Sequence, residues 1–144
     1  MKKERIIVYT VLALVLLALI GCTVAYYYER QPKTPYSELT ASEVEGITLI
    51  YGIHSYELSE GEIAELIPLI QKLVIYERDD SWREYDGCSF TDIEVRKKDG
   101  VAFTLHFMNP FILIDGKGYR CEYKPCDNAG RYVYQIARRE FHGE

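Results

Sequence analysis

The most continuous hydrophobic segment of the chain runs from residue 6 to residue 28. These 23 residues contain no charged side chain, and Lys2, Lys3 and Arg5 precede them. As a helix with a rise of about 1.5 Å per residue, the segment is long enough to cross the ~30 Å hydrocarbon layer of a membrane. Because positive charge is retained on the cytosolic side, the pattern predicts a cytosolic N-terminus, with the rest of the chain outside.

The same segment has a second interpretation, a lipoprotein signal peptide of residues 1–21. Leu19-Ile20-Gly21-Cys22 resembles the lipobox of bacterial lipoproteins, in which the chain is cut before the cysteine and the thiol, here of Cys22, carries lipid. The apolar run, however, continues past Cys22 into three tyrosines, residues 26–28, which suit the aromatic belt at a membrane interface. Both interpretations place the following residues outside the cell, and the choice between them stays open here.

After this anchor, residues 29–37 are polar and contain two prolines, as expected of a short linker. Residues 38–144 are enough for one hydrophobic core and too few for two. The sequence therefore predicts an anchor, a linker and one extracytoplasmic domain.

Helical periodicity occurs twice in this domain. Ser59 and Glu62 form the pattern of a capping box, and apolar residues follow every three or four positions as far as residue 74, around Pro68. A second apolar stripe predicts a helix that Asp127 caps and that ends near residue 141.

Strand patterns predict an antiparallel sheet. The runs are residues 46–53, 89–97, 101–108, 111–114 and 119–123. A three-residue loop at 98–100 pairs Val95 with Phe103 and puts the apolar side chains on one face. The next hairpin, turning at 116–117 or through four residues, pairs Ile114 with Tyr119. We therefore expect an α+β domain in which two helices cover one face of a four- or five-stranded sheet.

The register of the first hairpin also places polar side chains together on the opposite face. It pairs Asp92 with His106 and Glu94 with Thr104. A carboxylate beside an imidazole occurs in catalytic triads, but no nucleophile is evident here, so an exposed cross-strand pair is the simpler interpretation. Asp92, Glu94 and His106 are therefore candidate binding residues on this face. Trp82, in the acidic loop 79–86, is a candidate contact on an alternative binding surface.

The net negative charge of the chain excludes some classes of partner. The chain has a net charge of −5, and residues 36–95 hold 14 acidic side chains but only 3 basic ones. Such a surface repels nucleic acid, so we expect no nucleic-acid partner. The acidic loop 79–86 lacks the ligand spacing of an EF-hand, and the cysteines and histidines match no zinc pattern. We therefore expect neither a metal nor a cofactor.

The domain has an odd number of cysteines, Cys88, Cys121 and Cys126. Outside the cell, one disulfide and one free thiol are the simplest arrangement, and Cys121 and Cys126 are close enough in sequence to form the disulfide. The strand pattern turns Cys121 toward the apolar face, which favours a small core residue over a reactive thiol.

One segment carries a resemblance. The run Ile114-Asp115-Gly116-Lys117-Gly118-Tyr119-Arg120, followed by Tyr123-Lys124-Pro125-Cys126, resembles uncharacterised membrane-anchored extracytoplasmic proteins of Gram-positive bacteria. The resemblance extends back through Trp82 and the capped helix. It implies a class and a location, and no reaction.

The sequence thus predicts a non-catalytic binding or sensing module, held at the membrane by a helix or a lipid and contacting a protein partner. Two alternatives remain at this point. One is a surface enzyme that uses a cysteine with His106 or His54, and the other is a structural subunit of a membrane complex.

Overall fold

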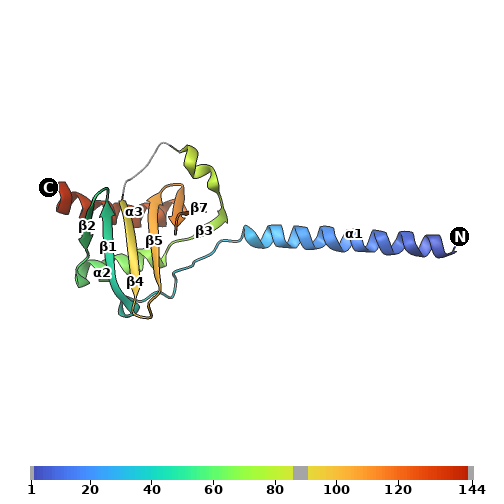
Figure 1. Ribbon diagram of the computed structural model, residues 1–144, viewed down its shortest axis with the longest axis horizontal. Coiled ribbons are helices and arrows are strands. Elements are labelled where there is room, and N and C mark those ends of the chain that lie inside the picture. Colours follow the sequence, from blue (N-terminus) through green and yellow to red (C-terminus); the bar gives the residue numbers. More distant parts are fainter. Residues whose placement is uncertain (1, 86–90, 143–144) are drawn as a thin grey trace. The chain divides into compact units, whose positions relative to one another are not determined.

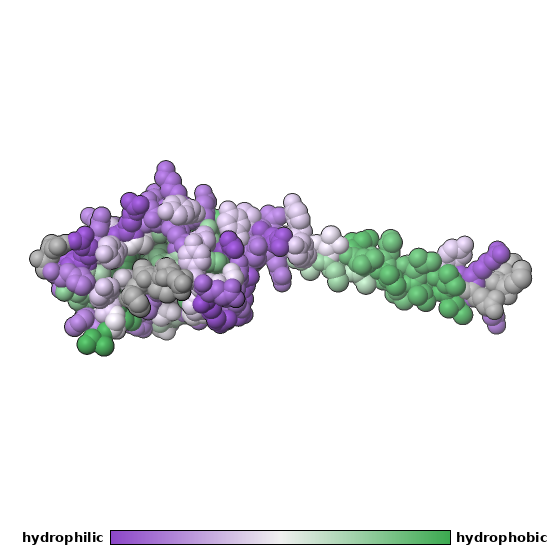
Figure 2. Space-filling view, turned by 90° about the horizontal axis from the view of Figure 1, so that it is seen from above, coloured by the Kyte–Doolittle hydropathy of each residue, from purple (hydrophilic) through white to green (hydrophobic). Residues whose placement is uncertain are grey.

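The computed structural model describes residues 2–85 and 91–142. The chain divides into two compact units, Met1–Gln31 and Pro32–Glu144. In the first unit, helix α1 (Lys2–Glu29) continues through Gly21 and Cys22 without interruption. Its segment Arg5–Glu29 is long and apolar enough to cross a membrane, judged by length and composition alone. Figure 2 shows apolar surface concentrated along this helix, whereas the visible surface of the second unit is mostly polar.

A seven-stranded antiparallel sheet forms the centre of the second unit. Its order is β2-β1-β4-β5-β6-β7-β3 (Figure 1). The strands are β1 (Val44–Tyr51), β2 (His54–Glu57), β3 (Ile75–Arg78), β4 (Thr91–Lys97), β5 (Ala102–Met108), β6 (Phe111–Ile114) and β7 (Lys117–Cys121). Of two short 3-10 helices, η1 (Ala41–Glu43) precedes β1 and η2 (Asp80–Glu84) lies between β3 and β4 in the sequence.

Two helices, α2 (Glu60–Gln71) and α3 (Tyr123–His142), cover one face of this sheet. They lie behind the strands in the view of Figure 1. The core lies between the layers, where alternate strand residues such as Ile47, Ile93 and Leu105 meet Leu66 and Val133 of the helices. All five side chains have no exposed surface. The predicted α+β architecture is therefore confirmed, with its core on the predicted face.

The number of strands was underestimated, at four or five instead of seven. The sequence pattern missed β2 and β3, which lie at the two edges of the sheet and have four residues each. Segments this short show too little alternation to be separated from loops, and only their pairing with β1 and β7 identifies them.

The first hairpin has the predicted register. Val95 pairs with Phe103, Asp92 with His106, and Gly100 has the positive φ of 85° that the three-residue loop requires. In the second hairpin the prediction was wrong by two residues, because Ile114 pairs with Lys117.

The cause of that shift is the turn at Asp115 and Gly116, whose φ angles are 50° and 73°. Two adjacent residues with positive φ form the two-residue type I′ turn, and asparagine, aspartate and glycine are the residues that tolerate it. Because the shift is an even number of residues, Cys121 still faces the core.

The capping box of α2 is confirmed. The Ser59 side chain accepts a hydrogen bond from the Glu62 backbone N–H, and the Glu62 carboxylate accepts one from the Ser59 backbone, at 2.7 Å. Helix α3 begins at Tyr123, four residues before the predicted cap at Asp127. Pro125 is compatible with this start, since backbone N–H groups in the first turn of a helix have no partner within it.

Part of the predicted linker belongs to the folded unit. Lys33 exchanges two backbone hydrogen bonds with Ile75, at 2.8 and 2.9 Å. Tyr36 stacks on Phe103, with 4.7 Å between the ring centroids.

Candidate functional site

The face of the sheet opposite the helices carries a row of paired residues that crosses five strands. Ile50 of β1 pairs with Asp92 of β4, Asp92 with His106 of β5, His106 with Leu113 of β6, and Leu113 with Gly118 of β7. Directly paired residues project to the same face of a sheet. The row therefore sets an acidic and an imidazole side chain between two aliphatic ones.

A pocket of about 340 Å³ lies over this row. Trp82, from η2, forms part of its wall. The other lining residues are Ile50, Asp92, Thr104, His106, Met108, Leu113 and Gly116. A mostly apolar lining with a few polar groups is typical of ligand-binding pockets.

Three of the four predicted site residues therefore meet in one cavity, because Trp82, Asp92 and His106 all line it. Glu94 does not line it, but lies two residues further along β4, opposite Thr104. Their role in binding stays a prediction.

The Asp92 carboxylate is bonded to Nδ1 of His106. Because an ionised carboxylate can only accept, Nδ1 carries a proton, which leaves Nε2 directed away from Asp92. The side chain of Asp92 is 47% exposed and that of His106 18% exposed. Asp92 thus keeps a solvent-accessible carboxylate while it orients the imidazole.

Trp82 reaches the pocket because Gly118 has no side chain. A Cβ at position 118 would lie 2.1 Å from Cδ1 of the indole and 2.8 Å from the carbonyl oxygen of Asp79. Arg83 lies over the indole ring, 5.2 Å from its centroid, and Nε1 is buried without a hydrogen-bond partner. Trp82 is therefore packed against the sheet at Gly118.

Sequence reasoning missed the aliphatic part of the pocket, namely Ile50, Met108 and Leu113. Strand alternation places all three on the open face, and this alternation could have predicted them as lining residues. Each lies in a run of apolar residues, however, so alternation between apolar and polar positions was not visible there.

Two carboxylates of the acidic loop, those of Asp79 and Asp80, are paired with arginines. Asp79 caps η2 and accepts a hydrogen bond from Nε of Arg120 at 2.8 Å, and Asp80 lies within 3.6 Å of Arg78 and Arg83. Hydrogen bonds from Ser81 and Arg120 lower the pKa of Asp79 to about 2. Asp86 lies outside the described residues. Within the described part of the chain, no group of three His, Cys, Asp or Glu side chains is arranged to hold a metal ion.

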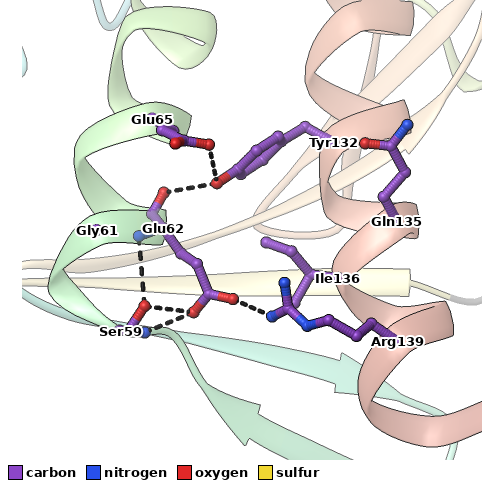
Figure 3. A pocket seen from close by; sticks show the side chains of 8 residues that line it. All are labelled: Ser59, Gly61, Glu62, Glu65, Tyr132, Gln135, Ile136 and Arg139. Atoms are coloured by element: carbon purple, nitrogen blue, oxygen red, sulfur yellow. Dashed lines mark hydrogen bonds and ion pairs between the residues drawn. The ribbon is translucent and has the colours of Figure 1, made fainter. Parts of the chain in front are cut away.

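A second and larger cavity, of about 570 Å³, lies between α2 and α3 (Figure 3). Arg139 of α3 pairs with the Glu62 carboxylate, and the Tyr132 hydroxyl donates to Glu65 at 2.9 Å. Burial would raise the pKa of Glu62, but hydrogen bonds from Ser59, Arg139 and Tyr56 lower it overall. These polar groups satisfy one another, so we assign the cleft to the attachment of α3 to α2.

The cysteines lie away from His106. Cys121 and Cys126 are free thiols buried under the helices, on the other face of the sheet. A hydrogen bond with Cys121 and burial raise the pKa of Cys126. The predicted disulfide between them stays a prediction, Cys88 lies outside the described residues, and Cys22 is exposed on α1.

Comparison of the chain with protein-family models, with curated proteins and with solved structures gives no match.

Proposed function

We propose that the chain is a membrane-anchored, extracytoplasmic and non-catalytic binding module. The observation that carries the proposal is the pocket on the open sheet face, where Trp82, Asp92 and His106 meet over an apolar floor. Helix α1 supplies the anchor. The cationic residues in its first turns favour a cytosolic N-terminus, and in this proposal residues 32–144 are outside.

A protein is the partner class that this site favours. Edges of the pocket are open, and Trp82 combines a large apolar surface with a fixed position, as hot-spot residues of protein interfaces do. The apolar side chains of Ile50, Met108 and Leu113 lie beside a few polar groups, a mixture that is usual in such interfaces.

Site-specific photo-crosslinking tests this proposal. A photoreactive amino acid at position 104, an exposed pocket residue, is compared in native membranes with the same group at Glu122, which is exposed outside the pocket. We expect a discrete adduct from position 104 only, and its loss in a second variant that also carries Trp82→Ala. Equal labelling from both positions, or an adduct that Trp82→Ala leaves unchanged, would contradict the proposal.

A further inference from the structure

The polar groups of the sheet-face pocket are almost all hydrogen-bond acceptors. Asp92 contributes the carboxylate oxygen that does not bond His106. The Thr104 hydroxyl lies 3.5 Å from the Asp115 carboxylate and donates to it, so its lone pairs remain for a ligand. Among the lining side chains, Trp82 also carries a donor, Nε1. That atom is buried and lies close to Gly118. A ligand that satisfies this pocket must therefore donate.

The charged side chains around the pocket also favour a ligand that donates hydrogen bonds. Glu94 lies two residues from Asp92 on β4. It forms no hydrogen bond or ion pair with the described residues. The nearest base on its own strand, Arg96, is already bound to Glu57. Arg120, on β7, is bound to Asp79. Asp92 thus lines the pocket with the His106 imidazole as its partner, and the Glu94 carboxylate lies on the same strand just outside the lining, without a partner among the described residues.

The remaining walls suit an aliphatic chain. Ile50 flanks Asp92 on one side, and Leu113 lies two strands away on the other. Since neighbouring strands are about 4.8 Å apart, the floor from Asp92 to Leu113 extends for about 10 Å. Met108 and Trp82 complete the apolar lining. Lysine has this combination, a compact ammonium with three donors on a four-carbon stem.

We infer that the pocket binds a primary ammonium group on a short aliphatic stem, presented as a lysine side chain of the partner. The ammonium donates to Asp92, beside Ile50, and is attracted by Glu94, while the stem lies along Met108 and Leu113. This inference rests on the proposed function, because it names the chemistry of the partner at the same site.

Trp82 is the only tryptophan of the chain, so its fluorescence reports on the pocket alone. The full chain in lipid nanodiscs is titrated with pentylammonium, and in parallel with pentanol and pentanoate. We expect a saturable change in Trp82 emission with pentylammonium and none with pentanoate. Asp92→Asn and Glu94→Gln should each weaken the binding about tenfold, whereas Glu122→Gln, an exposed carboxylate outside the pocket, should leave it unchanged.

The possible failures are distinguishable. If pentanol or pentanoate binds as tightly as pentylammonium, or if Glu94→Gln has no effect, the pocket does not select a cation and the inference is overturned. If crosslinking from position 104 still captures a partner in that case, the proposed function survives. If pentylammonium binds as expected but position 104 captures nothing, the cation specificity is supported and its assignment to a protein lysine is overturned.

Discussion

At the scale of single residues, Gly118 decides where Trp82 lies. A methyl group there would overlap the indole ring, and the Asp79 carbonyl blocks an outward shift. Gly118→Ala should therefore displace Trp82, shift its fluorescence to longer wavelength and lower the free energy of unfolding by about 1–3 kcal/mol. Denaturant unfolding followed by fluorescence measures both effects.

Gly61→Ala is the matched control, because Gly61 lies in α2 and a Cβ there meets no atom within 4 Å. Alanine costs less conformational entropy than glycine in a helix, so this variant should gain about 0.5–1 kcal/mol. Unchanged Trp82 emission in Gly118→Ala would show that the indole does not rest on this glycine.

Asp79 gives a prediction about pH. Its pKa is lowered from 3.8 to about 2, so its contribution to stability is complete above the unfolded value. That contribution is lost as the pH falls through the folded value, which sets a window from about pH 4 down to about pH 2. The difference in melting temperature between the parent chain and Asp79→Asn should therefore shrink across this window, as calorimetry at several pH values would measure. A difference that stays constant from pH 6 to pH 2 would show that the cap does not depend on the charge.

At the scale of elements, contacts within the cleft of Figure 3 hold α3 on α2, and one of them can be tested by substitution. The Tyr132 hydroxyl donates to Glu65 at 2.9 Å and lies 3.4 Å from the Glu62 carbonyl oxygen. Tyr132→Phe should lower the free energy of unfolding by about 0.5–1.5 kcal/mol, the usual net value of one hydrogen bond. Tyr134→Phe, on the same helix and 47% exposed, should have little effect. Equal losses in both variants would show that the hydroxyl of the partly buried Tyr132 contributes no more than an exposed one, and would contradict this role of its hydrogen bond.

The elements also show how far the sequence could predict the fold and the site. The pairing of Asp92 with His106 follows from a turn of three residues, so the information is local and the prediction was correct. The second hairpin was shifted because both Asp115–Gly116 and Gly116–Lys117 satisfy turn chemistry, and the apolar pattern does not distinguish registers that differ by two. Trp82 could not be assigned to the pocket with His106, since its position depends on packing against Gly118, 36 residues later in the chain.

At the scale of the whole molecule, the two interpretations of the anchor differ in what Cys22 does. A spanning helix is retained by its apolar length, and α1 continues unbroken through Cys22. A lipoprotein is retained by the lipid on that thiol and has lost residues 1–21. In the proposed arrangement, Cys22→Ala should leave the chain in the membrane fraction after alkaline extraction, and mass analysis should recover the N-terminal peptide.

A second variant, to be compared with Cys22→Ala, tests the spanning helix by placing charge within it. Leu14→Arg together with Leu17→Arg should weaken insertion, since a charged residue at the centre of a spanning helix costs roughly 2.5–3.5 kcal/mol. With a spanning helix, this double variant therefore leaves the membrane fraction while Cys22→Ala stays. Release by Cys22→Ala alone would assign the anchor to lipid. Protease added to intact cells should digest residues 32–144 with either anchor, so protection of that unit would place it in the cytosol and remove the basis for an extracytoplasmic partner.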